Sequence, residues 1–283
     1  MNEIIFLLVL AFFWILFASF QDIKKREIAN WLSYSLIIFA LGFRFFYSLF
    51  SKGVGWGFFY HGLIGLGIFF ALGHLFYYSK LFAGGDAKLM ISLGAVLPFS
   101  AVFSANVRIL LMFLFLFLLF GAIYGFIWTV ILGLKNFKQL KEEIKKQLAL
   151  NQAFVYSITI SGLLIIIFGS FINYIVLYFG ILIFSLPYFY IFAKSVDEIC
   201  MIKIVDTKSL AEGDWLYNDI KLGKNVIRAN WDGLTKKDII SIRKKHKKIA
   251  IRQGIPFVPV FLISFLVLAY IWMFRPELMN MFL

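Results

Sequence analysis

Seven long runs of apolar residues occupy most of the chain and are separated by short charged segments. They lie near residues 3–20, 31–50, 57–79, 87–104, 108–133, 154–193 and 255–274. About 20 apolar residues are enough for a helix to cross a bilayer. The run at 154–193 is too long for one helix, and Asn173 near its middle predicts a tight turn between two spans. The pattern predicts about eight spans, with six as the alternative count.

The composition supports a membrane protein. Of the 283 residues, 62% are hydrophobic and only 15% are charged, whereas about a quarter of a soluble domain is charged. We therefore expect an all-α polytopic membrane protein. The first run follows Glu3, has no basic residues before it and ends without a small-residue cleavage site, so it is expected to be a permanent span rather than a signal peptide.

The basic residues predict the orientation. With eight spans and the N-terminus outside, 24 of the 28 lysines and arginines fall on the cytoplasmic side. Arg44, Lys52, Arg108 and Arg275 are left on the other side. Because cytoplasmic loops of membrane proteins are enriched in Lys and Arg, this arrangement is strongly favoured. We expect a cell-membrane protein with both termini extracellular, and the net charge of +13 favours contact with anionic lipids rather than with nucleic acid.

The same segmentation predicts five parts. They are N-terminal membrane helices (1–134), a basic amphipathic cytoplasmic loop (135–153), additional membrane helices (154–193), a small cytoplasmic α+β domain (194–254), and a last membrane helix with a tail (255–283). In the α+β domain, "MIKIVD" and "KNVIRAN" are typical of strands, "LAEGDWL" of a turn, and "LTKKDIISIRKKHKK" of a helix beginning near Thr235.

Several classes of site find no support in the sequence. The only cysteine is Cys200, which excludes an intrachain disulfide and a multi-cysteine zinc site. The three histidines show no metal-ligand spacing. No phosphate-binding glycine motif follows a strand. We expect neither a metal nor a cofactor.

Two aspartates are the candidate functional residues. Asp22 follows the first apolar run and Asp86 precedes the fourth, so both are expected at the cytoplasmic edge of the membrane. Acidic groups at membrane depth are costly and are candidates for function. Gly84 and Gly85 permit a close backbone approach or a turn with positive φ before Asp86. The alternatives are an ordinary charged helix end for Asp22 and a helix N-cap for Asp86.

Two neighbouring carboxylates can share one proton, because both cannot easily ionise together. One can then act as a base toward water and the other as an acid toward the leaving amine of a peptide bond. Arg26 and Lys88 would stabilise an ionised carboxylate if they approach it. They are otherwise explained by the basic bias of the cytoplasmic side.

The segments around both aspartates resemble a known family. "SFQDIKKREIANWL" and "AGGDAKLMISLGAVLP" are similar to the two aspartate motifs of the archaeal preflagellin and type IV prepilin peptidases. "LAEGDWL", "WDGLTKKDI" and "RQGIPFVPVFLISFL" resemble the cytoplasmic domain and last span of the archaeal branch, so the resemblance covers about residues 15–270. In the family's G-x-G-D segment, Ala83 replaces the first glycine here.

This resemblance implies an aspartyl endopeptidase with Asp22 and Asp86 as the catalytic pair and Gly84 and Gly85 as positioning residues. Its substrates would be archaellin or type IV pilin-like precursors, from which it removes a short basic leader at the cytoplasmic face. Bacterial relatives often carry a cysteine-rich zinc segment and N-methylate the product. The single cysteine excludes that segment, so proteolysis without methylation is expected.

Two other classes compete with the protease. A small ion-coupled transporter would use the aspartates to bind a proton or cation, but it would place them near the bilayer midplane and show internal repeats. A membrane scaffold would use segment 194–254 to bind a partner. In the scaffold, Asp→Asn changes would leave function intact.

Overall fold

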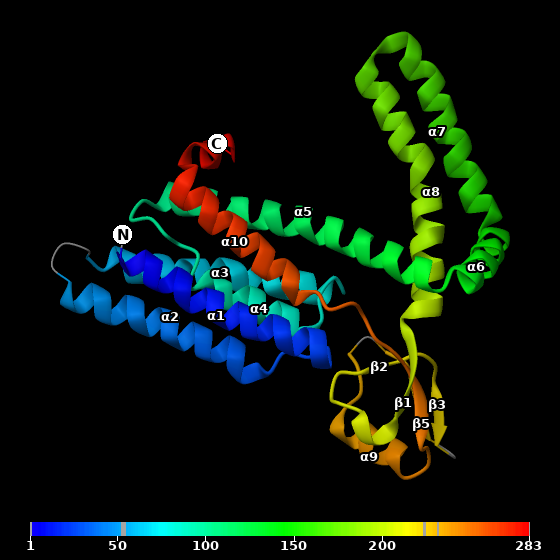
Figure 1. Ribbon diagram of the computed structural model, residues 1–283, viewed down its shortest axis with the longest axis horizontal. Coiled ribbons are helices and arrows are strands. Elements are labelled where there is room, and N and C mark those ends of the chain that lie inside the picture. Colours follow the sequence, from blue (N-terminus) through cyan, green and yellow to red (C-terminus); the bar gives the residue numbers. More distant parts are fainter. Residues whose placement is uncertain (1, 52–54, 223–224, 231, 283) are drawn as a thin grey trace. The chain divides into compact units, whose positions relative to one another are not determined.

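The computed structural model describes residues 2–51, 55–222, 225–230 and 232–282. Lys224 in the expected strand "KNVIRAN" and Trp231 in "WDGLTKKDI" lie outside these ranges. The chain forms two compact units, residues 1–125 with 254–283, and residues 126–253. The first unit is a helical bundle that contains both candidate aspartates (Figure 1).

The helices of the bundle follow the apolar runs of the sequence. They are α1 (Asn2–Lys25), α2 (Asn30–Phe50), α3 (Gly57–Tyr78), α4 (Gly84–Gly94), the first part of α5 (Phe103–Lys135) and α10 (Val258–Phe274), followed by the short η2 (Pro276–Phe282). Within the described residues, six helices are long and apolar enough to cross a membrane, namely α1, α2, α3, α5, α7 and α8. The polytopic all-α architecture expected from the sequence is confirmed.

The fourth apolar run does not form a full span. Its helix, α4, has 11 residues and ends at Gly94. Residues 95–99 continue as buried, non-helical chain. Backbone of this kind is tolerated inside a membrane bundle only where other groups satisfy its carbonyls. The expected span at 87–104 is therefore wrong in length.

Arg44 donates hydrogen bonds to the carbonyl oxygens of this irregular segment. Its guanidinium is fully buried on α2 and donates to the carbonyl oxygens of Ala95 (2.9 Å), Val96 (2.9 Å) and Pro98 (2.6 Å). A fourth bond of 2.9 Å reaches Phe58 O on α3, and the guanidinium carbon lies 4.4 Å from the centre of the Phe58 ring. Arg44 thus caps the C-terminal end of α4 from inside the bundle. In the sequence, it stands only as one of four basic residues expected on the non-cytoplasmic side.

Glycines bring α3 and α4 into close contact. Gly65 and Gly94 face one another, and Gly73 leaves room for the Ile91 side chain and the Ala87 carbonyl oxygen. Gly67, on the same helix as Gly65, has open space where a Cβ would lie. Small residues permit tight helix packing in lipid, and Gly65 and Gly73 have this role between α3 and α4.

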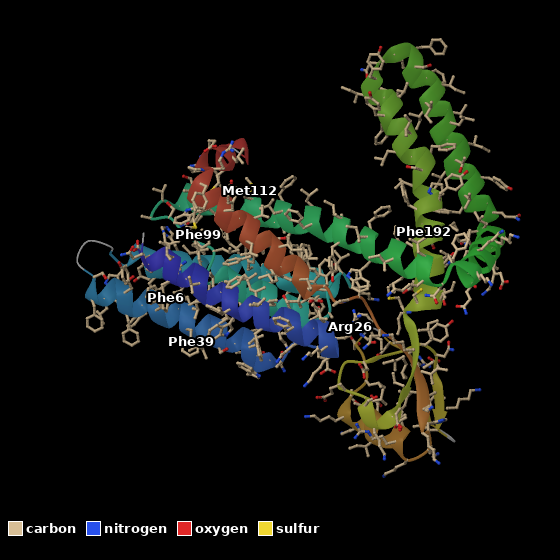
Figure 2. The ribbon with its side chains drawn as sticks, in the orientation of Figure 1. Phe6, Arg26, Phe39, Phe99, Met112 and Phe192 are labelled. Atoms are coloured by element: carbon tan, nitrogen blue, oxygen red, sulfur yellow. The ribbon has the colours of Figure 1, made fainter. Side chains whose placement is uncertain are left out.

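The bundle has a buried interior and an apolar exterior. Its core includes Leu7, Ile15, Leu36, Met90 and Phe261. Large apolar side chains, such as Phe6 and Phe39, are exposed on the outside (Figure 2). An exposed surface of this composition is expected where lipid tails replace water.

The second unit begins with the end of α5, and three helices follow before its sheet domain. They are α6 (Phe137–Leu150), α7 (Gln152–Ile172) and α8 (Tyr174–Cys200). Asn173 separates α7 from α8 and caps α8, since its side-chain oxygen accepts from the amides of Ile175 (2.7 Å) and Val176 (3.2 Å). This confirms the expected turn at Asn173.

A small sheet domain follows α8. Its elements are β1 (Ile202–Asp206), η1 (Thr207–Ser209), β2 (Trp215–Leu216), β3 (Ile220–Leu222), β4 (Asn225–Ile227), α9 (Lys236–Arg243) and β5 (Lys248–Arg252). The strand order is β1-β5-β2, all antiparallel, and β3 pairs with β4 separately. Thr235 and Asp238 form a reciprocal capping box at the start of α9. Strand, turn and helix occur in the expected order, but α9 ends at Arg243, and Lys248 at the end of the expected helix segment instead begins β5.

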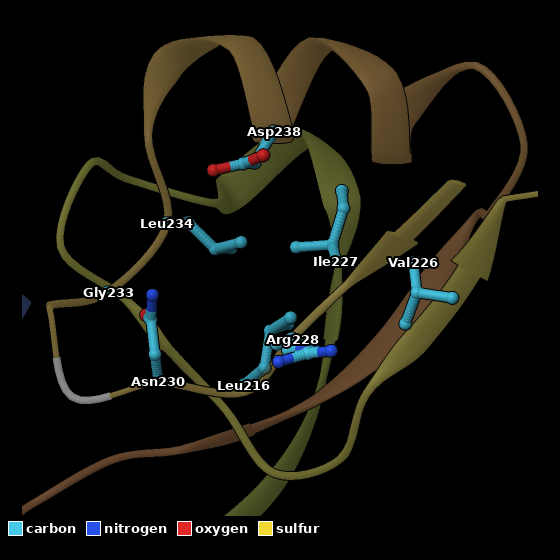
Figure 3. A pocket seen from close by; sticks show the side chains of 8 residues that line it. All are labelled: Leu216, Val226, Ile227, Arg228, Asn230, Gly233, Leu234 and Asp238. Carbon is cyan, nitrogen blue, oxygen red and sulfur yellow. The ribbon is translucent and has the colours of Figure 1, made fainter.

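The two glycine turns of this domain are hydrogen-bonded to each other. Gly213 N–H donates to Leu234 O (3.0 Å) and Leu234 N–H donates to Asp214 O (2.9 Å). Gly213 and Gly233 both have positive φ. A pocket of about 280 Å³ lies beside this junction, and Arg228, Asn230 and Asp238 contribute its polar groups (Figure 3).

Candidate active site

Asp22 lies in the last turn of α1 and is only 7% exposed. The helix ends at Lys25. The next residue, Arg26, adopts a left-handed conformation (φ 59°), and its amide donates to Asp22 O (2.8 Å). A left-handed conformation costs a non-glycine residue roughly 1 kcal/mol. The Arg26 side chain donates to Gly254 O (3.1 Å) and so joins the end of α1 to the segment that leads into α10.

The first turn of α10 binds the Asp22 carboxylate. Val258 N–H donates to Asp22 Oδ2 at 2.9 Å, and the Phe257 amide also contacts this carboxylate. Free N–H groups and the helix dipole make a helix N-terminus a favourable place for a negative charge. Asp22 is therefore held by backbone that lies 236 residues further along the chain.

Asp86 occupies the first turn of α4 and is partly exposed. Ala83 is the N-cap residue, so Asp86 is the third helical residue and its carboxylate reaches back to the Ala83 amide. This is one half of a capping-box arrangement. Asp86 thus lies at the start of the helix, as expected. The alternative of an N-cap aspartate does not hold, because the N-cap is three positions earlier, although Asp86 does help to cap the helix.

Gly84 and Gly85 begin α4 rather than forming a turn with positive φ. Neither is among the described glycines with positive φ, so of the two possibilities that the sequence allowed, the turn with positive φ does not occur. A Cβ on Gly85 would lie 3.3 Å from the Ile28 side chain, whereas one on Gly84 would meet only the Tyr77 ring at 3.8 Å. Gly85 is the position at which the start of α4 closely approaches the α1–α2 connection.

The two aspartates belong to one electrostatic site. Burial disfavours the charged form of both carboxyl groups. In addition, the charge of Asp22 acts on Asp86, and the charge of Arg26 acts on Asp22. Lys88 instead donates to Asn30 Oδ1 (2.7 Å) at the start of α2. No cluster of three or more potential metal ligands occurs among the residues the structure describes.

Aromatic side chains line the bundle next to this site. Phe257, whose amide contacts Asp22, has its ring 6.3 Å from that of Phe82 and 5.7 Å from that of Phe117. Phe117 and Phe261 lie 4.5 Å apart between ring centres. An apolar wall beside two carboxylates strengthens their mutual repulsion, because electrostatic interactions are stronger in a low dielectric.

A second apolar feature borders α4 without including Asp86. It is a groove of about 540 Å³ between α2, α3 and α4, lined by residues that include Tyr34, Phe70, Gly84 and Lys88. Positions 84 and 88 share one helix face, while position 86 points about 200° away from Gly84. The groove is therefore separate from the carboxylate pair.

The contact with α10 was not expected from the sequence. The two aspartates and the glycines were selected from local motifs, whereas the Val258 amide has no side-chain chemistry to mark it. The segment "IPFVP" offers one clue. Pro256 and Pro259 have no N–H, so the segment's free amides are concentrated at Phe257 and Val258.

Comparison with known families supports the assignment of this bundle. Residues 9–129 match the model of the type IV leader peptidase family. The match includes Asp22 and Asp86 and confirms the resemblance seen in the two aspartate motifs. No curated protein and no solved structure matches the chain. The family supports a leader-peptidase-like protease, and the apolar helices suggest a multi-pass membrane protein.

Proposed function

We propose that this chain, which matches the type IV leader peptidase family over residues 9–129, is a membrane aspartyl endopeptidase with Asp22 and Asp86 as its catalytic pair. The observation that carries the proposal is that the first turn of α4, which bears Asp86, packs against the connection that follows Asp22: Gly85 closely approaches Ile28, and Lys88 donates to Asn30 (2.7 Å). The action of the Asp22 charge on Asp86 agrees with this packing. Two such carboxyl groups can share a proton and divide the base and acid roles of peptide hydrolysis. This chemistry requires no cofactor.

The proposed substrates are archaellin or type IV pilin-like precursors, cleaved at the cytoplasmic face to remove a short basic leader. Lys24, Lys25 and Arg26 at the end of α1 and Lys80 after α3 support a cytoplasmic location for the aspartate side of the bundle. Gly84 and Gly85 would position Asp86, and Arg26 would stabilise an ionised carboxylate at Asp22. The contact of Lys88 with Asn30 favours a role in holding α2 to α4 over a direct role at the carboxylates.

The basic surface of α6 supports a further part of the proposal. Lys138, Lys141, Lys145 and Lys146 are exposed on this helix, while Leu140 is buried. A basic helix next to membrane spans favours contact with anionic lipid headgroups. We assign this helix a membrane-surface role and no chemistry.

The test is cleavage of a precursor that carries a basic leader before a hydrophobic helix. Membranes would contain wild type, Asp22→Asn, Asp86→Asn or the control Asp206→Asn at equal expression. Asp206 lies in the sheet domain, and asparagine can still accept from Lys208 N–H. We expect wild type and the control to cleave, and each dyad variant to be slower by at least about 100-fold.

Mass spectrometry of the product tests the reaction type, since proteolysis alone gives an unmethylated N-terminus. Cleavage at the wild-type rate by a folded Asp22→Asn or Asp86→Asn protein would refute the aspartyl mechanism. A methylated product would refute the expectation of proteolysis alone.

A further inference from the structure

The two carboxylates of the site have unequal partners. Asp22 is buried and accepts from Val258 N–H, with the Phe257 amide also in contact and the Arg26 charge nearby. Asp86 is partly exposed and has the single amide of Ala83. Each hydrogen bond to a carboxylate favours its ionised form. Burial disfavours a negative charge on both carboxyl groups, so the difference between them comes from their partners. The Val258 and Phe257 amides and the charge of Arg26 favour the negative charge at Asp22.

The start of α10 is built to give its amides to Asp22. Pro259 occupies the second helical position and Pro256 precedes Phe257, and neither has an N–H. The amide of Val260 is already bonded to Phe257 O (3.0 Å). The amides left free in this turn are those that contact Asp22.

Other charged and titratable groups near the two carboxyl groups leave the negative charge favoured at Asp22. Arg26 acts on Asp22 from the end of the same helix, and Tyr124 on α5 acts on Arg26. Lys88 on α4 is bonded to Asn30. The charge that Asp86 senses is that of Asp22, which disfavours a second negative charge on Asp86.

We infer that Asp22 is the ionised member of the pair and Asp86 the protonated one, with the Phe257 and Val258 amides as positioning groups that fix this order. The inference rests on the proposed function. Asp22 then takes a proton from water as the water oxygen bonds to the scissile carbonyl carbon, and Asp86 gives its proton to the carbonyl oxygen. When the C–N bond breaks, Asp22 passes its proton to the leaving amine and the oxygen returns the other to Asp86.

The first test titrates each carboxyl alone, without substrate. Purified full-length Asp86→Asn protein retains only Asp22 of the pair, and Asp22→Asn protein retains only Asp86. Infrared spectra of both, measured against the Asp22→Asn/Asp86→Asn double variant, isolate a single carboxyl group. We expect the proton-dissociation constant of Asp22 to be at least about tenfold larger than that of Asp86, a difference of about 1.4 kcal/mol.

The second test removes one amide donor. Proline is well tolerated at the first position of a helix, so Val258→Pro deletes the N–H there, and Val258→Ala is the matched control that keeps it. In the Asp86→Asn background, we expect proline to lower the Asp22 dissociation constant about threefold to tenfold, and alanine to leave it unchanged. In the Asp22→Asn background, neither change should move the Asp86 titration.

The inference is overturned if Asp86 ionises at the same pH as Asp22 or at a lower one. It is also overturned if a folded Val258→Pro protein titrates like the alanine control. Both measurements are made on the carboxyl groups themselves. Failure of the protease proposal would instead appear in the cleavage assay, as leader removal that survives loss of either aspartate.

Discussion

Gly65 on α3 and Gly94 on α4 face one another so closely that a Cβ on either would overlap the carbonyl oxygen of the other. Gly94 is also the last residue of α4, immediately before the chain that Arg44 caps. The pair therefore fixes the distance between α3 and α4 at the end opposite Asp86. A short helix that is held at its far end has little freedom to tilt its first turn.

We expect Gly65→Ala to displace α4 and to reduce precursor cleavage together with stability. The added methyl group would collide with backbone, which cannot move aside as a flexible side chain can. Gly67→Ala is the matched control, because it adds the same methyl group to the same helix in open space. Cleavage rate and thermal stability in detergent are the measurements. Equal behaviour of the two variants would contradict a role for the Gly65–Gly94 contact.

Replacement of Arg44 should destabilise the bundle strongly. In Arg44→Met, the carbonyls of Phe58, Ala95, Val96 and Pro98 lose their donor inside the protein. Each buried polar group without a partner costs about 1–3 kcal/mol, and the losses are not additive. We expect a fall of about 3 kcal/mol or more in the free energy of unfolding.

Arg44→Lys should recover only part of this stability, since an ammonium lacks the planar fork that reaches several carbonyls at once. Arg275→Met is the control, because Arg275 is exposed and forms a surface ion pair with Glu277. Reversible unfolding in mixed micelles gives the comparison. A folded Arg44→Met protein as stable as this control would show that water satisfies the carbonyls instead.

In the sheet domain, Gly233→Ala should be more damaging than Gly213→Ala. Both positions have positive φ, a conformation that strains an L-residue by about 1–2 kcal/mol. At Gly233, the new Cβ would in addition overlap the backbone of Gly213, while a Cβ on Gly213 meets open space. Amide hydrogen exchange of β1 and β5 reports the local stability. The reverse order of the two variants would contradict this packing.

The stability of the sheet domain should also depend on Asp214. Burial raises the pKa of this carboxyl above its ordinary value, even though its Oδ2 accepts from Ala211 N–H (2.8 Å). A raised pKa in the folded state means that the contribution to stability is present at low pH and is lost as pH rises through the folded value.

Asp214→Asn keeps an acceptor for Ala211 N–H and carries no charge. We therefore expect this variant to be more stable than wild type at pH 7 and equal to it near pH 3, where the aspartate is neutral. Hydrogen exchange in the same strands, corrected for the intrinsic effect of pH, is the measurement. A wild type that is more stable than the variant at pH 7 would refute the expected sign.

Much of this molecule could be predicted from local patterns. The apolar runs identified the membrane helices because lipid imposes a minimum length, and Asn173 marked a turn because it lies near the middle of a run that is too long for one helix. Thr235 and Asp238 identified the start of α9, since both halves of a capping box are visible within four residues. The aspartate pair was found in the same way, from the short sequence motifs around Asp22 and Asp86.

The features that were missed depend on contacts between distant segments. The early end of α4 results from Arg44 and Gly65, which lie on other helices and leave no mark in the run 87–104. The partner of Asp22 is a backbone amide, and every residue except proline has one. Only the three-dimensional position of Val258 distinguishes it from the other amides in the chain.

The bond between Asp22 and Val258 also imposes an order on biosynthesis. The carboxylate is made with the first helix, but its backbone partner is translated 236 residues later. Until α10 emerges from the ribosome and enters the bundle, Asp22 must be solvated by water or by headgroups. Until then, Asp22 of the nascent chain would lie in the membrane without its backbone partner. The proposed catalytic site would be complete only after the last helix has been translated and inserted.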